Sequence, residues 1–137
     1  NDARLMENFE YSPALKLGLS TAIASILKFG VKKINKKIIK LTVYFRSKVS
    51  ENKNITLYEN EDSLSGLNTI DFLNKNINDL CLYLKSFGVN TYVSDKITSS
   101  LYFNKIKKKS LLRISFHHFN TKKEIDYLVS LLEDYGS

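Results

Sequence analysis

Residues 111–126 read Leu-Leu-Arg-Ile-Ser-Phe-His-His-Phe-Asn-Thr-Lys-Lys-Glu-Ile-Asp, and this stretch decides the fold. Apolar and polar residues alternate in it, which is typical of a strand with two unlike faces. One face carries Leu112, Ile114, Phe116 and His118. The other face carries Arg113, Ser115 and His117. The pattern Thr121-x-x-Glu124 that follows is a capping box, so we expect this strand to lead directly into a helix.

The polar face of this strand is a candidate binding surface. A guanidinium, a hydroxyl and an imidazole on one face suit recognition of a carboxylate or a phosphate. A solvated sheet face explains the same pattern equally well. Arginine is rare here, since the 21 basic residues include only Arg4, Arg46 and Arg113. Arg113, placed between Leu112 and Ile114, is therefore a stronger candidate for binding a carboxylate or a phosphate than any of the lysines.

Size and composition indicate one domain that can bury a core, with 137 residues of which 43% are hydrophobic. No stretch approaches the roughly 20 apolar residues of a membrane span, so no membrane partner is expected. Cys81 is the single cysteine and cannot form a disulfide within the chain, which favours a cytoplasmic location.

Two helices are expected first. Ser12-Pro13 is a helix start, and Gly30 a helix stop. The helix between them is apolar on most sides, so we expect it to be largely buried. A second helix, residues 31–49, has one apolar stripe and a lysine-rich remainder.

From residue 52 the pattern becomes that of a small sheet with helices. Strands are expected at 55–58, 67–73, 89–93 and around Arg113, with a long polar segment at 95–110. Helices are expected from Asn76 or Asn78 to Phe87 and after Thr121. The order strand–strand–helix–strand–strand–helix predicts an α+β fold, a mostly antiparallel sheet with helices on one face. We expect residues 1–137 to form one domain, with a helical segment at 1–51 and an α+β part at 52–137.

Several kinds of site are disfavoured. The phosphate-binding patterns G-x-x-x-x-G-K-S/T and G-x-G-x-x-G are absent. His117 and His118 are adjacent, so a regular strand points them to opposite faces and no metal site is expected. Cys81 falls on an apolar helix stripe, where a thiol is inert. No RNA-binding motif occurs, which makes nucleic acid an unlikely partner, although the net charge of +7 and the basic run 105–109 leave one alternative open. That alternative is a free-standing basic module that binds nucleic acid or another polyanion.

The sequence resembles class V enzymes that depend on pyridoxal phosphate, a family of aminotransferases, cysteine desulfurases, selenocysteine lyases and isopenicillin-epimerase-like proteins. Residues 113–126 resemble the closing motif R-x-S-x-H-x-Y/F-N-T-x-x-E-I/V-D. Residues 2–14, followed by Leu-Gly-Leu at 17–19, resemble A-R-R-F-E-x-W/F-E-x-S-P-A-x-x-L-G-L. Ser65-Gly66 is similar to the start of S-G-I-V-x-F. The resemblance covers nearly the whole chain in the right order.

The resemblance implies the C-terminal small domain of a fold-type-I enzyme. In this family an upstream domain holds most of the pyridoxal phosphate and carries the lysine bonded to it; no lysine here matches that lysine. This chain alone is therefore expected to be inactive, with no catalytic residue of its own, and the whole enzyme to be a homodimer acting on an amino acid. Arg113 matches the arginine that binds the substrate α-carboxylate, and Ser12 a residue that contacts the cofactor phosphate.

One branch of the family is disfavoured by the same resemblance. Cysteine desulfurases carry a persulfide-forming cysteine in the loop that corresponds to residues 93–110. No cysteine lies there in this chain. The aminotransferase, epimerase-like and lyase branches remain.

Overall fold

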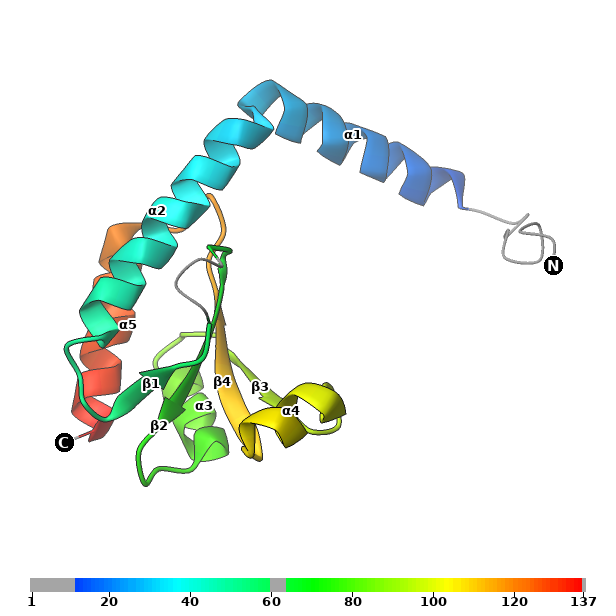
Figure 1. The fold of residues 1–137 in the computed structure, drawn as a ribbon. Helices are drawn as coiled ribbons and strands as arrows, with labels where there is room; N and C mark the ends of the chain where they lie inside the picture. Colours follow the sequence, from blue (N-terminus) through cyan, green and yellow to red (C-terminus); the bar gives the residue numbers. More distant parts are fainter. Residues whose placement is uncertain (1–11, 60–63, 137) are drawn as a thin grey trace, which may run out of the picture. The chain divides into compact units, whose positions relative to one another are not determined.

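The computed structural model describes residues 12–59 and 64–136 (Figure 1). The chain divides into two compact units, Asn1–Ile34 and Asn35–Ser137. The boundary lies within a helix rather than in the loop after residue 51, where the sequence changes character. That the whole chain acts as one domain stays a prediction.

The first unit contains α1 (Pro13–Phe29), which begins and ends where the sequence predicted. The Ser12 side chain accepts a hydrogen bond from the Leu15 N–H, at 3.5 Å, and so caps the helix. At the other end Gly30 adopts a φ of 97°, and its N–H donates to the Ile26 carbonyl. The expectation that this helix is largely buried is wrong for this chain, since none of its residues is buried in the structure. A helix that is apolar on most sides is usually covered by another element or domain.

Among the residues that the structure describes, no single helix is long and apolar enough to cross a membrane. Only α1 and α2 (Val31–Val49) taken together, across the break between them, meet those criteria.

The second unit contains a four-stranded sheet. Its strands are β1 (Ile55–Leu57), β2 (Leu67–Phe72), β3 (Tyr92–Asp95) and β4 (Ser110–Ser115). They lie in the order β1-β2-β4-β3, and every neighbouring pair is antiparallel. The other helices are α3 (Ile77–Ser86), α4 (Ser100–Ile106) and α5 (Lys122–Gly136). The predicted α+β class is confirmed.

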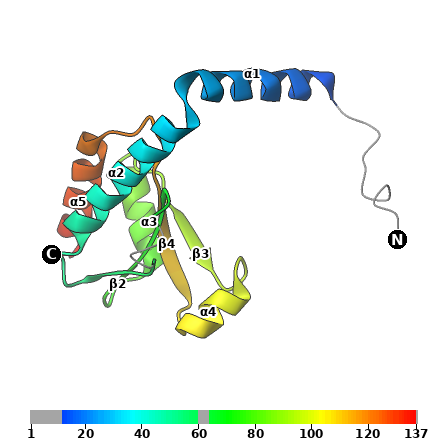
Figure 2. The same cartoon turned by 45° about the horizontal axis from the view of Figure 1, so that its top comes forward.

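Three helices cover one face of this sheet and form the core with it. Figures 1 and 2 show α2 and α5 side by side, and Tyr44 of α2 donates a hydrogen bond to Asp126 of α5. The core cluster takes apolar side chains from α2, α3 and α5 and from alternate positions of β2 and β4. Its fully or nearly fully buried members include Phe45, Leu80, Leu84, Ile70, Phe72, Leu112, Ile114 and Leu132. Each such side chain stabilises the fold by about 1.5 to 3 kcal/mol relative to an exposed one.

Two elements differ from the sequence prediction. β3 begins at Tyr92 instead of residue 89, because the chain turns after α3 through Gly88, whose φ is 78°. The segment expected to be polar loop contains α4. Its Phe103 is 1% exposed and Leu111 of β4 is fully buried, yet both lie outside the main core cluster. The prediction of a polar segment at residues 95–110 did not take these two buried apolar side chains into account.

The turn before β2 is fixed by buried polar contacts. Thr42 Oγ1 donates to the Ser65 carbonyl at 2.7 Å, and Arg46 Nε donates to Asn68 Oδ1 at 2.8 Å. Thr42 and Asn68 are fully buried, so each contact satisfies a group that water cannot reach. These contacts hold the start of β2 against α2 and thereby position β2 beside β4.

Candidate functional site

The face of the sheet opposite the core displays Arg113, as the sequence predicted. Leu112 and Ile114 are buried, whereas Arg113 and Ser115 are exposed. Thr69 of β2 and Tyr92 of β3 lie directly opposite Arg113 in the two strand registers. Residues that face each other in this way share one side of a sheet. Arg113 is therefore the centre of a row that crosses three strands.

An aromatic ring holds the Arg113 side chain. Its guanidinium carbon lies 4.7 Å from the centroid of the Tyr92 ring, within cation–π range. Among residues 12–59 and 64–136, no carboxylate forms an ion pair with Arg113. The guanidinium thus keeps its N–H groups for an external carboxylate, which it can bind with two parallel hydrogen bonds.

Other charged groups near this row make contacts inside the chain, although Glu59 Oε2 is buried and accepts no hydrogen bond from the described residues. Glu59 Oε1 accepts hydrogen bonds from the N–H and the hydroxyl of Thr69, both at 2.7 Å. Lys108 forms an ion pair with Asp71, and its pKa is raised chiefly by that hydrogen bond. The pKa of Tyr102 is raised mainly by burial and further by the charge of Glu59. In contrast to Lys108, Arg113 has no ion-pair partner among the described residues and is available to bind an external anion.

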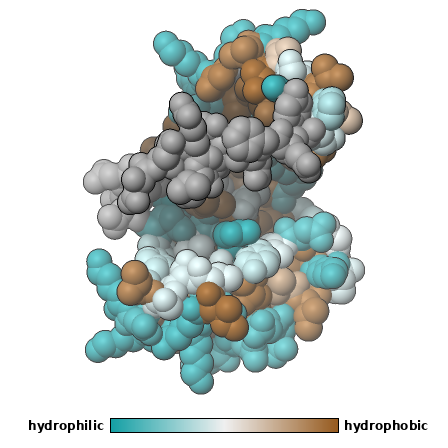
Figure 3. Space-filling model, turned by 90° about the vertical axis from the view of Figure 1, so that its right-hand side faces the viewer, coloured by the Kyte–Doolittle hydropathy of each residue, from teal (hydrophilic) through white to brown (hydrophobic). Residues whose placement is uncertain are grey.

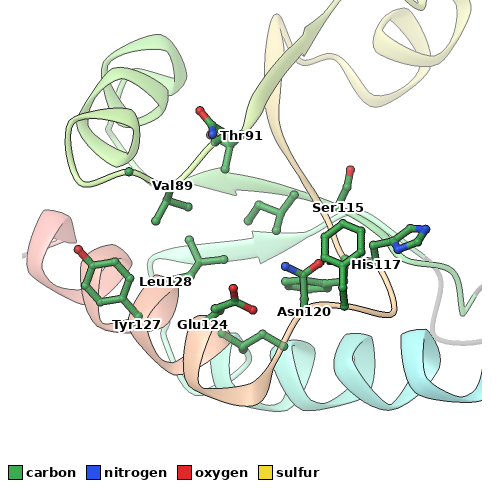
Figure 4. Close-up of a pocket in the computed structure, with 14 residues that line it drawn as sticks. Val89, Thr91, Ser115, His117, Asn120, Glu124, Tyr127 and Leu128 are labelled. Atoms are coloured by element: carbon green, nitrogen blue, oxygen red, sulfur yellow. Dashed lines mark hydrogen bonds between the residues drawn. The ribbon is translucent and has the colours of Figure 1, made fainter. Parts of the chain in front are cut away.

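A cavity of about 600 Å³ lies at the far end of β4, and Arg113 is not part of its wall. β3 and β4 stop pairing at Tyr92 and Arg113, and the chain before β3 diverges from the chain after β4. Figure 4 shows Val89 and Thr91 on one side of the resulting space, with side chains of α5 and of the β4–α5 loop around the rest.

Some polar groups of this cavity already have partners in the loop and the helix cap. The N–H of His117 donates to Asn120 Oδ1 at 2.8 Å, and the Tyr127 hydroxyl donates to the Phe87 carbonyl at 3.3 Å. Glu124 accepts from the Thr121 N–H at 2.6 Å, which lowers the pKa of Glu124. The cavity is a hollow between elements, and several of its polar groups help to build those elements. No sequence pattern indicated it, because it arises where two distant segments separate.

The remaining sequence candidates lie apart from Arg113. His117 and His118 follow the end of β4, and their rings lie 4.4 Å apart, so they do not point to opposite faces of a strand as expected. Burial lowers the pKa of His118, and His117 and Lys37 lower it further. Cys81 is partly buried in α3 and accepts a hydrogen bond from the Thr91 hydroxyl at 3.5 Å. In the part of the chain that the structure describes, no three His, Cys, Asp or Glu residues form a metal site.

The residues present fit one contact to pyridoxal phosphate but not the covalent site. Ser12 stands at the start of α1, where a hydroxyl and free N–H groups suit a phosphate. The described lysines are exposed, apart from Lys108, which is partly buried and pairs with Asp71. None of them lines the cavity at the far end of β4.

Comparison with known proteins identifies relatives. The family model "Aminotransferase class-V" matches residues 11–128. The fold is similar to the apo cysteine desulfurase of Thermococcus onnurineus NA1, with a TM-score of 0.81, 18% identity, 86% of this chain covered and 30% of that one. It is also similar to the Escherichia coli cysteine desulfurase CsdA, with a TM-score of 0.77, 20% identity, 85% of this chain covered and 29% of that one.

A third similar structure is the NifS-like protein of Rickettsia africae ESF-5, with a TM-score of 0.69, 20% identity, 82% of this chain covered and 32% of that one. A comparison with curated proteins gave no match. The chain spans about 30% of the length of the first of these structures, and at these identities the likeness establishes the fold.

Proposed function

Because the chain belongs to the class-V aminotransferase family, whose enzymes depend on pyridoxal phosphate, we propose that it is the C-terminal domain of such an enzyme acting on an amino acid. An upstream domain supplies most of the cofactor site, including the lysine that binds the cofactor. The proposal includes a homodimer in the cytoplasm.

Arg113 carries this proposal. Its side chain is exposed on the open sheet face, lies within cation–π range of Tyr92, and forms no ion pair with a carboxylate of the described residues. A solvated sheet face of no function needs no arginine held in this way. A guanidinium that contacts an aromatic ring and has no carboxylate partner is suited to bind the planar carboxylate of an amino acid.

The residues of this chain bind and orient the substrate. Pyridoxal phosphate, when bound, supplies an electron sink for the bond that breaks at the amino-acid Cα. Arg113 holds the carboxylate on one side of that carbon, which fixes the bond to be broken relative to the reacting centre. The Ser12 hydroxyl, at the start of α1, would donate a hydrogen bond to a phosphate oxygen of the cofactor.

The segment between β3 and β4 disfavours one reaction subtype. The similar structures include enzymes named cysteine desulfurases, yet residues 93–110 contain no cysteine. Cys81 lies in α3, where its sulfur accepts a hydrogen bond from the Thr91 hydroxyl. We therefore place the reaction among the aminotransferase, epimerase-like and lyase branches.

The test is Arg113→Ala in the full-length protein. A charge-assisted hydrogen-bonded contact is worth about 1.5 to 3 kcal/mol. The Michaelis constant for amino-acid substrates should therefore rise roughly ten- to hundredfold. Lys109→Ala, which removes an exposed cation just before β4, serves as the control and should leave the constant within about twofold. An unchanged Michaelis constant in Arg113→Ala rules out the assignment.

A further inference from the structure

We infer that Tyr92 is a positioning residue for Arg113, and that its ring sets how tightly the enzyme binds the substrate carboxylate. This inference rests on the proposed function. It adds a second residue, from a different strand, to the carboxylate site.

Strand pairing is the first observation. Tyr92 and Arg113 are directly opposite each other in the β3–β4 register, and the pairing ends at this point. Directly opposed residues have their Cβ atoms about 4.5 to 5.5 Å apart on the same face. The strand pairing therefore places the side chains of Tyr92 and Arg113 next to each other, whichever rotamers they adopt.

The contact is the second observation. The guanidinium carbon lies 4.7 Å from the ring centroid, within cation–π range. A cation–π contact does not consume the N–H groups of a guanidinium as hydrogen-bond donors. No carboxylate of the described residues forms an ion pair with Arg113, so these donors are open to an external carboxylate.

Exposure shows that Tyr92 does not serve the core. Its side chain is 49% exposed, and it lies outside the core cluster. β3 is an edge strand, so Tyr92 has a neighbouring strand only on the side of β4. A large aromatic residue in this place contributes little to the packing of the fold. Its described ring contact is with Arg113.

The expected effect follows from the freedom of arginine. An exposed arginine samples many rotamers, and binding a carboxylate with two hydrogen bonds requires one of them. The ring restricts the side chain beforehand and lowers that entropic cost. A cation–π contact at an exposed site corresponds to roughly two- to fivefold in affinity.

The experiment compares three variants of the full-length protein. Tyr92→Phe keeps the ring, and Tyr92→Leu keeps apolar bulk without it. Tyr127→Leu is the matched control, since it makes the same change at a tyrosine that is 45% exposed on α5. Tyr92→Leu should raise the Michaelis constant about two- to fivefold with kcat nearly unchanged. Tyr92→Phe and Tyr127→Leu should match the wild type. Thermal unfolding verifies that each variant folds. If Tyr92→Leu does not fold, Tyr92→Val, with its strand-forming side chain, replaces it.

A double variant separates this inference from the proposed function. In the Arg113→Ala background, Tyr92→Leu should have no further effect on the Michaelis constant. An effect of Arg113→Ala without any effect of Tyr92→Leu overturns the positioning role and leaves the proposed function standing. A loss in Tyr92→Leu that persists in the Arg113→Ala background shows that Tyr92 acts independently, and also overturns the inference. No effect of Arg113→Ala itself removes both.

Discussion

At the start of β2, Gly66 lies so close to the end of β4 that a side chain has no room there. The Phe116 N–H donates to the Gly66 carbonyl at 2.8 Å. A Cβ atom on Gly66 would collide with the Phe116 carbonyl and lie 3.0 Å from a methyl carbon of Ile38. This contact begins the β2–β4 register, and the register places Thr69 opposite Arg113. A single glycine thus helps to set the position of Arg113 relative to β2.

Gly66→Ala should destabilise the protein by about 1 to 3 kcal/mol, because the collision is with backbone that must move. Gly18→Ala is the matched control: a Cβ on Gly18 meets nothing within 4 Å, and alanine favours a helix more than glycine does. Urea denaturation of both variants measures the change in unfolding free energy. Equal stability of Gly66→Ala and the wild type would contradict the close approach of the two strands.

Among the elements, α5 shows how local chemistry fixes a boundary. Thr121 and Glu124 form a reciprocal cap: the Thr121 N–H donates to Glu124 Oε2, and the Glu124 N–H donates to Thr121 Oγ1 at 3.3 Å. The Asn120 side chain closes the turn before it. The helix start therefore needs no distant contact, which is why the motif could be located in the sequence.

Glu124→Gln should remove a stabilisation that depends on pH. Hydrogen bonds from Thr121 lower the pKa of Glu124, so its charged form is favoured in the folded state. The resulting stability is present above the ordinary glutamate pKa of about 4.3 and is lost as pH falls through the lower, folded value. The thermal midpoint of Glu124→Gln should lie below that of the wild type at neutral pH, and the gap should narrow in acid. Glu51→Gln, at an exposed loop residue, is the control; a gap that widens in acid would contradict the prediction.

The elements also show where sequence reasoning stops. Both N-terminal helices were located correctly because Ser12, Pro13 and Gly30 are local signals. β3 was placed three residues early, and α4 was missed, because Phe103 and Leu111 are buried through contacts that no short window contains. The exposed face with Arg113 followed from simple alternation. The ring of Tyr92 against it depends on a non-local register, and so does the cavity beyond β4.

At the scale of the whole molecule, exposed apolar side chains occur in both units. α1 buries none of its residues, and Leu15 is 77% exposed. Apolar side chains also reach the surface of the α+β unit, as the brown regions in the lower part of Figure 3 show. Together with the class-V family match and the 30% coverage of a similar structure, this favours a chain completed by a further domain. Under the proposed function, Arg113 binds the substrate carboxylate only together with that further domain.

The central claim is that Arg113 binds the substrate carboxylate. A crystal structure of the full-length protein with a bound amino acid tests it most directly. We expect both carboxylate oxygens to lie about 2.7 to 2.9 Å from guanidinium nitrogens of Arg113. A carboxylate held by other residues, with Arg113 turned to solvent, would contradict the account.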